Sequence, residues 1–146
     1  MRRIALLLGL LAPACHAPRA TLDPNPACAG FDAAGSDASA IALADEVMRA
    51  MGGRAAWDRT RVLCWTFFGR RSHVWDKWTG DYRLEEGERV VLLNLESGAG
   101  RVFDKGVERT DAAEVGPALQ RAKSVWINDS YWLVMPYKLK DSGVTL

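Results

Sequence analysis

The fold is decided by residues 61–109, RVLCWTFFGRRSHVWDKWTGDYRLEEGERVVLLNLESGAGRVFDKGVER. Aromatic and β-branched residues are frequent in this stretch, and its apolar residues tend to recur with a period of two, which is typical of β-strands. Turn-forming residues divide the stretch into expected strands at 61–68, 71–78, 81–85, 89–95, 101–103 and 107–109. Short connections between consecutive strands predict an antiparallel meander sheet.

Both faces of the first expected strand are apolar. Leu63, Trp65 and Phe67 alternate along it with Val62, Cys64 and Phe68. A strand of this kind is expected to be covered on both sides. Cys64 is then a small buried side chain, and a disulfide with Cys28 in an oxidising compartment is the alternative.

The second hairpin predicts a particular pairing of side chains. If its loop is the two residues Thr79-Gly80, then Asp76 lies opposite Arg83 and Trp75 lies opposite Leu84. Opposite charges at facing positions stabilise a sheet by about 0.2–1 kcal/mol. Gly80 would supply the positive φ that the turn requires.

A helix is predicted before the sheet, at residues 37–51, with Ser36 or Asp37 as its N-cap and Gly52-Gly53 at its end. A further short turn at 53–58 is expected to present Trp57 to the core. The apolar stripe of the helix consists of Ile41, Ala44, Val47, Met48 and Met51.

A second helical region follows the sheet and starts near Pro117, which suits a first helical turn. Asn128-Asp129-Ser130 is expected to interrupt it before a short helix at 131–135, which Pro136 stops. Residues 143–146 have the pattern of a strand that is just beginning. The stripe of the longer helix consists of Leu119, Ala122, Val125 and Trp126.

The N-terminus has the layout of a secretory signal peptide: Arg2 and Arg3, an apolar run at 4–12, then small residues. The run is far shorter than the roughly 20 residues of a membrane-spanning helix, and a buried N-terminal helix is the alternative. Ala12-Pro13-Ala14 before Cys15 resembles a bacterial lipobox, which would make Cys15 a lipidated first residue. Ordinary cleavage after Ala14 or after Ala20 stays open.

The predicted domain organisation is therefore a signal peptide at 1–14, extending to 20 if cleavage is later, a flexible Pro/Ala-rich tether at 15–36 and one folded domain at 37–146. The formal net charge is +1 and there is no basic run, so a nucleic-acid partner is not expected.

The residues carry no recognisable catalytic, metal-binding or cofactor-binding motif. The three cysteines have no metal-ligand spacing, and His73 is the only histidine after the leader. Acidic residues 85, 86 and 88 surround a turn and suit a solvated hairpin tip. The chain is instead rich in tryptophan, at 57, 65, 75, 78, 126 and 132. These rings either form the core or line a pocket for an apolar ligand.

Taken together, residues 40–146 resemble the N-terminal half of a LolA-like domain, the superfamily of periplasmic lipoprotein carriers. The resemblance rests on the order of the elements, on Trp75-Asp76, Thr79-Gly80-Asp81 and Arg83, and on residues 126–139, WINDSYWLVMPYKL. It implies an α+β fold in which an antiparallel meander forms part of an incomplete β-barrel, with helices on its concave face. Such a domain has several further strands, so this chain is expected to be truncated and to need them for a closed apolar core.

The expected function is an exported binding module for lipid acyl chains or lipoproteins in envelope trafficking. The expected location is the periplasm, or the periplasmic face of the outer membrane, of a Gram-negative-type bacterium, with membrane contact through the lipid anchor. No enzyme activity, metal or cofactor is expected. The alternative is a surface-anchored structural or glycan-contacting lipoprotein without lipid cargo, with Trp75 and Trp78 as an exposed stacking platform. The expected ligand-lining residues are Trp65, Phe67, Trp75, Trp78, Val47, Met48 and Met51.

Overall fold

The computed structural model describes residues 25–146 and has an α+β fold, as predicted. Its sheet is an open antiparallel meander in the order β1-β2-β3-β4-β5-β6. The strands are β1 (Val62–Phe67), β2 (Arg71–Asp76), β3 (Asp81–Glu86), β4 (Arg89–Asn94), β5 (Gly100–Asp104) and β6 (Val107–Arg109). The helices are α1 (Ala38–Ala50), α2 (Arg54–Arg59), α3 (Ala112–Val134) and the 3-10 helix η1 (Met135–Lys138).

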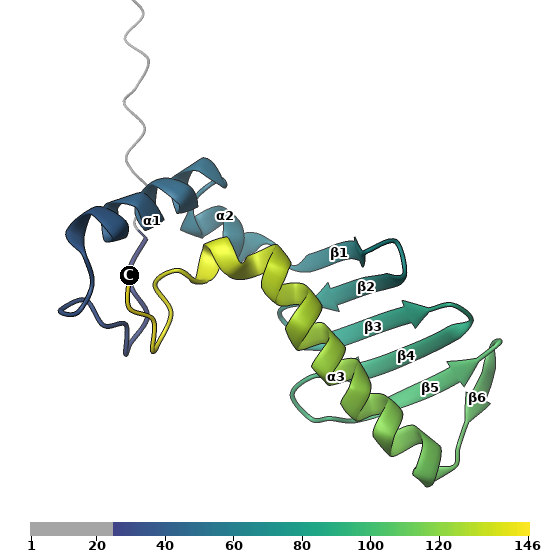
Figure 1. The fold of residues 1–146 in the computed structure, drawn as a ribbon. Helices are drawn as coiled ribbons and strands as arrows, with labels where there is room; N and C mark the ends of the chain where they lie inside the picture. Colours follow the sequence, from purple (N-terminus) through teal and green to yellow (C-terminus); the bar gives the residue numbers. More distant parts are fainter. Residues whose placement is uncertain (1–24) are drawn as a thin grey trace, which may run out of the picture.

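Helix α3 crosses one face of the sheet diagonally, from the β6 side to the β1 side, and this face is called the inner face below (Figure 1). Gly100 makes close packing possible, because a Cβ there would lie 2.5 Å from Leu119 Cδ2 of α3 and 2.4 Å from Leu92 O. The core between sheet and helix consists of Tyr82, Leu84, Val91, Leu93, Val102, Ala118 and Ala122. Burial of these side chains holds α3 on the sheet, since apolar area removed from water is the main stabilising term.

Helix α3 runs without a break through Asn128-Asp129-Ser130, so the predicted interruption is wrong. Polar residues favour helix ends when no better partner is near. Here the Asp129 carboxylate is buried, and it accepts hydrogen bonds from Arg71 Nε at 2.6 Å and Arg71 Nη2 at 3.0 Å. The helix also begins earlier than predicted, because Asp111 caps it by accepting from Ala113 N.

Within residues 25–146 the outer face of β1 is exposed, contrary to the prediction that both sides of this strand are covered. Val62, Cys64 and Phe68 are exposed, whereas Leu63, Trp65 and Phe67 are partly buried toward α3. Cys64 is consequently not a core residue, and both described cysteines, Cys28 and Cys64, are free thiols. Apolar residues on both faces of a strand indicated burial, but in this structure they leave apolar surface exposed instead.

The second hairpin has a different register from the predicted one. Trp75 pairs with Tyr82 and Val74 pairs with Arg83, so the connection is longer than the two residues Thr79-Gly80. Asp76 does not face Arg83 and forms its ion pair with Arg61 of the neighbouring strand end. A shift of two residues keeps every side chain on its predicted face, and Gly80 has the expected positive φ, +74°.

The two ends of the described chain lie together near α1 (Figure 1). Cys28 N donates to Lys140 O, Asp32 N to Val144 O and Asp37 N to Leu146 O. Residues 143–146 therefore do not add a strand to the sheet, and residues 25–36 are docked, whereas composition predicted a flexible tether there. The rest of that segment, the predicted signal peptide and Cys15 lie outside the described residues.

Candidate functional site

A hollow of about 290 Å³ lies at the C-terminal end of α3, between this helix, α2 and the inner face of the sheet. Its surface is mainly apolar, which is the usual character of a ligand pocket. Its volume lies just below the roughly 300–1,000 Å³ typical of ligand pockets. The apolar and aromatic lining residues are Trp57, Trp75, Trp126, Ile127, Tyr131, Val134 and Tyr137.

The aromatic rings that line this hollow also hold one another in place. Trp75 of β2 meets Trp126 of α3 edge to face, with ring centroids 5.1 Å apart. Trp57 of α2 stacks on Tyr137 of η1 at 4.2 Å. Lys77 clamps the second pair, because its Nζ lies 3.5 Å from the Trp57 ring centroid and donates to Trp57 O at 2.5 Å. Rings fixed in this way leave little side-chain freedom to lose when a ligand binds.

The polar part of the hollow is formed by Arg54, Ser130, Lys138 and Asp141. Arg54 Nε donates to Asp58 Oδ1 at 2.9 Å, and the hydrogen bond to Asp58 raises the pKa of Arg54. Lys138 forms an ion pair with Asp141. The charged groups are therefore paired, and the apolar part of the hollow carries no unpaired charge that would repel an acyl chain.

A buried polar cluster positions α3 beside this hollow. His73 Nδ1 lies 2.8 Å from Tyr82 Oη, and its Nε2 lies 3.2 Å from Asp129 Oδ2, outside good hydrogen-bond geometry. Burial lowers the pKa of His73, so the ring is neutral at neutral pH. Burial alone would raise the pKa of Asp129, but the hydrogen bonds from Arg71 and Asn128 hold it below its ordinary value. His73 is therefore buried inside the fold rather than exposed to solvent.

The structure separates the seven expected lining residues into several places. Trp75 lines the hollow described above, and Phe67 lines a second hollow of about 440 Å³ with Phe68, Asn128 and Trp132. Trp65 lies between the two hollows on the inner face and stacks on His73, with ring centroids 4.4 Å apart. Trp78 is 61% exposed at the far end of the β2–β3 connection.

The apolar stripe of α1 was expected to face the aromatic strand, but it does not. Helix α1 packs on η1 and the C-terminal segment instead. Met48 is buried there beside Pro136 and Leu139, Val47 is partly buried, and Met51 is partly exposed. Besides Trp75 of β2, the walls of the hollow come from α2, α3 and η1. The tryptophan content indicated that Trp57 and Trp126 form either core or pocket, whereas Val134 and Tyr137 were not expected to line a pocket.

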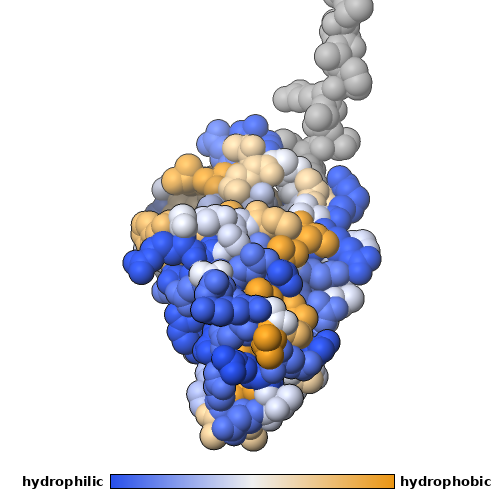
Figure 2. Space-filling model, turned by 90° about the vertical axis from the view of Figure 1, so that its right-hand side faces the viewer, coloured by the Kyte–Doolittle hydropathy of each residue, from blue (hydrophilic) through white to orange (hydrophobic). Residues whose placement is uncertain are grey.

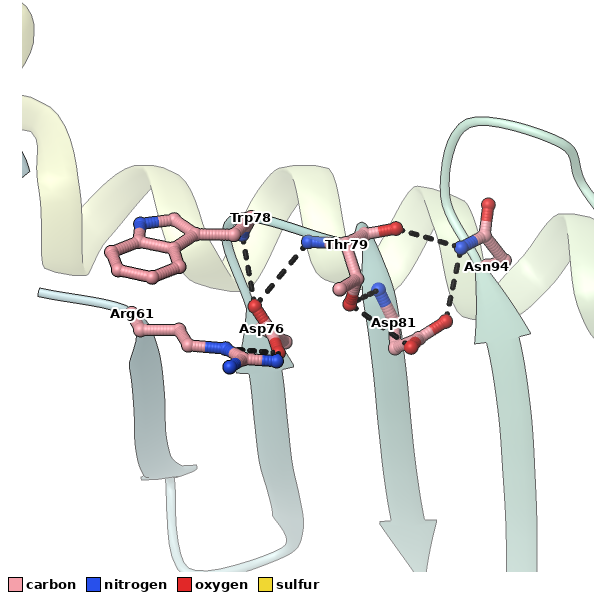
Figure 3. Close-up of polar contacts among 6 residues, drawn as sticks. All are labelled: Arg61, Asp76, Trp78, Thr79, Asp81 and Asn94. Carbon is pink, nitrogen blue, oxygen red and sulfur yellow. Dashed lines mark hydrogen bonds and ion pairs between the residues drawn. The ribbon is translucent and has the colours of Figure 1, made fainter.

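The side chains of the loop between β2 and β3 form a network of hydrogen bonds that includes Arg61 and Asn94 (Figure 3). Asp76 Oδ1 accepts from Trp78 N at 2.9 Å and from Thr79 N at 3.3 Å, while its other oxygen pairs with Arg61 at 2.8 Å. Asp81 is engaged by Thr79 Oγ1 and by Asn94 Nδ2. These carboxylates stabilise the turn, as local side-chain to backbone hydrogen bonds do in such loops.

Residues 25–146 contain no group of His, Cys, Asp and Glu side chains arranged to hold a metal ion. No helix in this part of the chain is both long enough and apolar enough to cross a bilayer. The chain matches no protein-family model, curated protein or solved structure.

Proposed function

We propose that this chain is an exported binding module for acyl chains of lipids or lipoproteins. The observation that carries the proposal is the tryptophan-walled hollow between α2, α3 and the inner face of the sheet. Its geometry agrees with the resemblance to LolA-like domains, in which acyl chains lie between sheet and helices. The proposal places the cargo next to Trp75 and Trp126 rather than next to α1.

The energetics suit a carrier that binds and releases. An acyl segment of about eight methylene groups that leaves water gains roughly 6 kcal/mol. Several kcal/mol are lost again when the ligand's motion is restricted. With a loss of about 3 kcal/mol, the dissociation constant of this segment is in the millimolar range, which makes release of the cargo easy.

The hollow also offers polar contacts at one side. Arg54 and Lys138 provide hydrogen-bond donors near the paired carboxylates of Asp58 and Asp141. The indole N–H of Trp126 is buried and meets no acceptor within residues 25–146. A carboxylate or ester oxygen of a lipid would satisfy such donors, while the methylene chain contacts the rings.

The test is binding of an environment-sensitive fatty-acid probe to the exported chain. Ile127 lines the hollow and is largely exposed, so Ile127→Ser removes apolar wall without opening the core. We expect about fivefold weaker probe binding, the effect of about 1 kcal/mol of lost contact. Val107→Ser on β6 is the matched control, because Val107 is similarly exposed and lines none of the hollows described here. Equal probe affinity in both variants, or no probe binding to the wild type, would contradict the proposal.

Export and anchoring form the second part of the proposal and rest on Ala12-Pro13-Ala14-Cys15. If Cys15 is the lipidated first residue, the chain fractionates with membranes, and Cys15→Ser shifts it to the soluble periplasmic fraction. Intact-mass analysis measures the modification directly. An unmodified N-terminus at any other residue would rule out the lipid anchor and leave the binding proposal intact.

One observation favours the alternative, a glycan-contacting lipoprotein without lipid cargo. The Trp78 ring is 61% exposed, and the Arg61 guanidinium lies 5.5 Å from its centroid (Figure 3). Trp75 cannot join it in a platform, because Trp75 packs on Trp126 at the inner face. A polysaccharide pull-down that Trp78→Ala abolishes, in a chain that binds no fatty-acid probe, would favour the alternative.

A further inference from the structure

The turn between β1 and β2 presents an aromatic ring to solvent. Phe68 is 84% exposed and has φ +48°. Positive φ is unusual for a bulky residue, and glycine or asparagine adopts it at lower cost. Gly69 follows with φ +64°, and no atom lies within 4 Å of where its Cβ would be. The turn therefore projects from the molecule and carries a large apolar side chain in a strained conformation.

A second exposed aromatic ring and an exposed cation accompany this tip. Trp132 of α3 is 68% exposed and lines the same hollow as Phe67, Phe68 and Asn128. Arg70 is exposed and makes no ion pair with any residue from 25 to 146. Figure 2, viewed from the side on which this turn lies, shows hydrophobic surface interrupting a largely hydrophilic face. Phe67, Phe68, Arg70 and Trp132 are called the aromatic corner below.

We propose that the aromatic corner docks on a membrane surface that contains anionic lipid. Phe and Trp rings suit the boundary between headgroups and acyl chains. The unpaired guanidinium of Arg70 complements anionic headgroups. The inference does not depend on the acyl-chain proposal, because the corner lies on the opposite side of α3 from the tryptophan-walled hollow.

The shape of the corner favours a membrane over a protein partner. A stable protein interface buries about 800 Å² on each partner. A projecting turn with one neighbouring helix side chain offers much less area. A bilayer needs no complementary surface, since a few apolar side chains enter it individually. The strain at Phe68 supports a role for the exposed ring itself, because an apolar side chain occupies a position where the backbone conformation favours glycine or asparagine.

The decisive variant is Phe68→Asn, which removes the ring and relieves the strained backbone. The experiment uses the full chain with Cys15→Ser, exported and purified from the periplasm, so that no lipid anchor contributes. Partitioning is measured by flotation with vesicles of phosphatidylcholine alone and with added phosphatidylglycerol. We expect Phe68→Asn to lower the partition coefficient about tenfold on both vesicle types. Its urea midpoint should stay equal to the wild-type value or rise.

Two further variants separate the contributions of ring and charge. Trp132→Ala should lower partitioning to a similar extent as Phe68→Asn. Arg70→Gln should lower it about fivefold on vesicles with phosphatidylglycerol and leave it unchanged on phosphatidylcholine. Trp78→Ala is the matched control, because Trp78 is an exposed aromatic residue at the other end of the strands, and it should retain wild-type partitioning.

Several results would overturn the proposal. These are wild-type protein that floats with neither vesicle type, unchanged partitioning of Phe68→Asn, and an equal loss in Trp78→Ala. A dimer that Phe68→Asn converts to a monomer, without vesicle binding, would assign the corner to a second copy of the chain. Failure of this inference is distinguishable from failure of acyl-chain binding, because Ile127→Ser should affect only the fatty-acid probe and Phe68→Asn only the vesicles.

Discussion

Removing the Asp129 carboxylate should destabilise the fold by about 3 kcal/mol. This side chain is fully buried and accepts hydrogen bonds from Arg71 Nε, Arg71 Nη2 and Asn128 Nδ2. Breaking a buried ion pair by deleting one partner typically costs 3–5 kcal/mol, because the remaining charge is left uncompensated. The expected value for Asp129→Ala lies at the low end, since the Arg71 side chain is 22% exposed and water partly solvates it.

The assay is urea denaturation followed by tryptophan fluorescence and circular dichroism. The control is Glu46→Ala, which removes the surface ion pair with Arg49 and should cost at most about 1 kcal/mol. The double variant Arg71→Leu/Asp129→Leu should recover much of the lost stability, because an apolar pair of similar size leaves no unpaired charge. A cost for Asp129→Ala no larger than that of Glu46→Ala would refute the expectation that the buried Arg71–Asp129 pair contributes several times more stability than a surface ion pair.

Two other predictions concern stability. Burial lowers the pKa of His73 below its ordinary value of 6.5. As the pH falls, the imidazole is therefore protonated in the unfolded chain before it is protonated in the folded protein. The free energy of unfolding should decline below about pH 6.5, by at most about 1.4 kcal/mol per pH unit. In His73→Gln the dependence of the urea midpoint on pH between 6.5 and 5 should be weaker, and an identical pH profile would contradict the assignment. Gly80→Ala should cost about 1–2 kcal/mol, because φ is +74° and the new Cβ would lie 3.1 Å from Glu96 Cγ. Gly116 lies in helical backbone with open space around it, so Gly116→Ala should instead raise the free energy of unfolding by about 0.5–1 kcal/mol. Equal effects of the two substitutions would disprove the assignment of the Gly80 effect to its positive φ.

Local patterns were sufficient for the six strands, the first helix and the class of fold. Alternation of apolar residues and Gly-containing turns located all six strands to within one or two residues of the observed bounds. Residue type alone restricted the cap of α1 to Ser36 or Asp37, and Asp37 is the cap, because its side chain accepts from Ser39 N and Ala40 N. These features depend on interactions between residues close in sequence, so the sequence carries their signal directly.

Features that depend on distant partners could not be read in this way. Asn128-Asp129-Ser130 has the composition of a helix break, but Arg71, 58 positions away from Asp129, satisfies the carboxylate within a continuous helix. The stripe of α1 was expected to face the aromatic strand, but it packs on η1 and the C-terminal segment instead. Periodicity tells which face of an element is buried, whereas the tertiary arrangement decides what covers that face.

The sequence by itself determined an antiparallel meander flanked by helices. Only the tertiary structure decided that Trp57, Trp75 and Trp126 converge on one hollow, while Trp78 faces solvent at the β2–β3 turn. It also decided that Phe68 projects from the β1–β2 turn rather than entering a second core. The physical reason is that the hydrophobic effect is not directional: it favours removal of an apolar side chain from water but does not select its neighbours. Packing among elements far apart in the chain selects those neighbours.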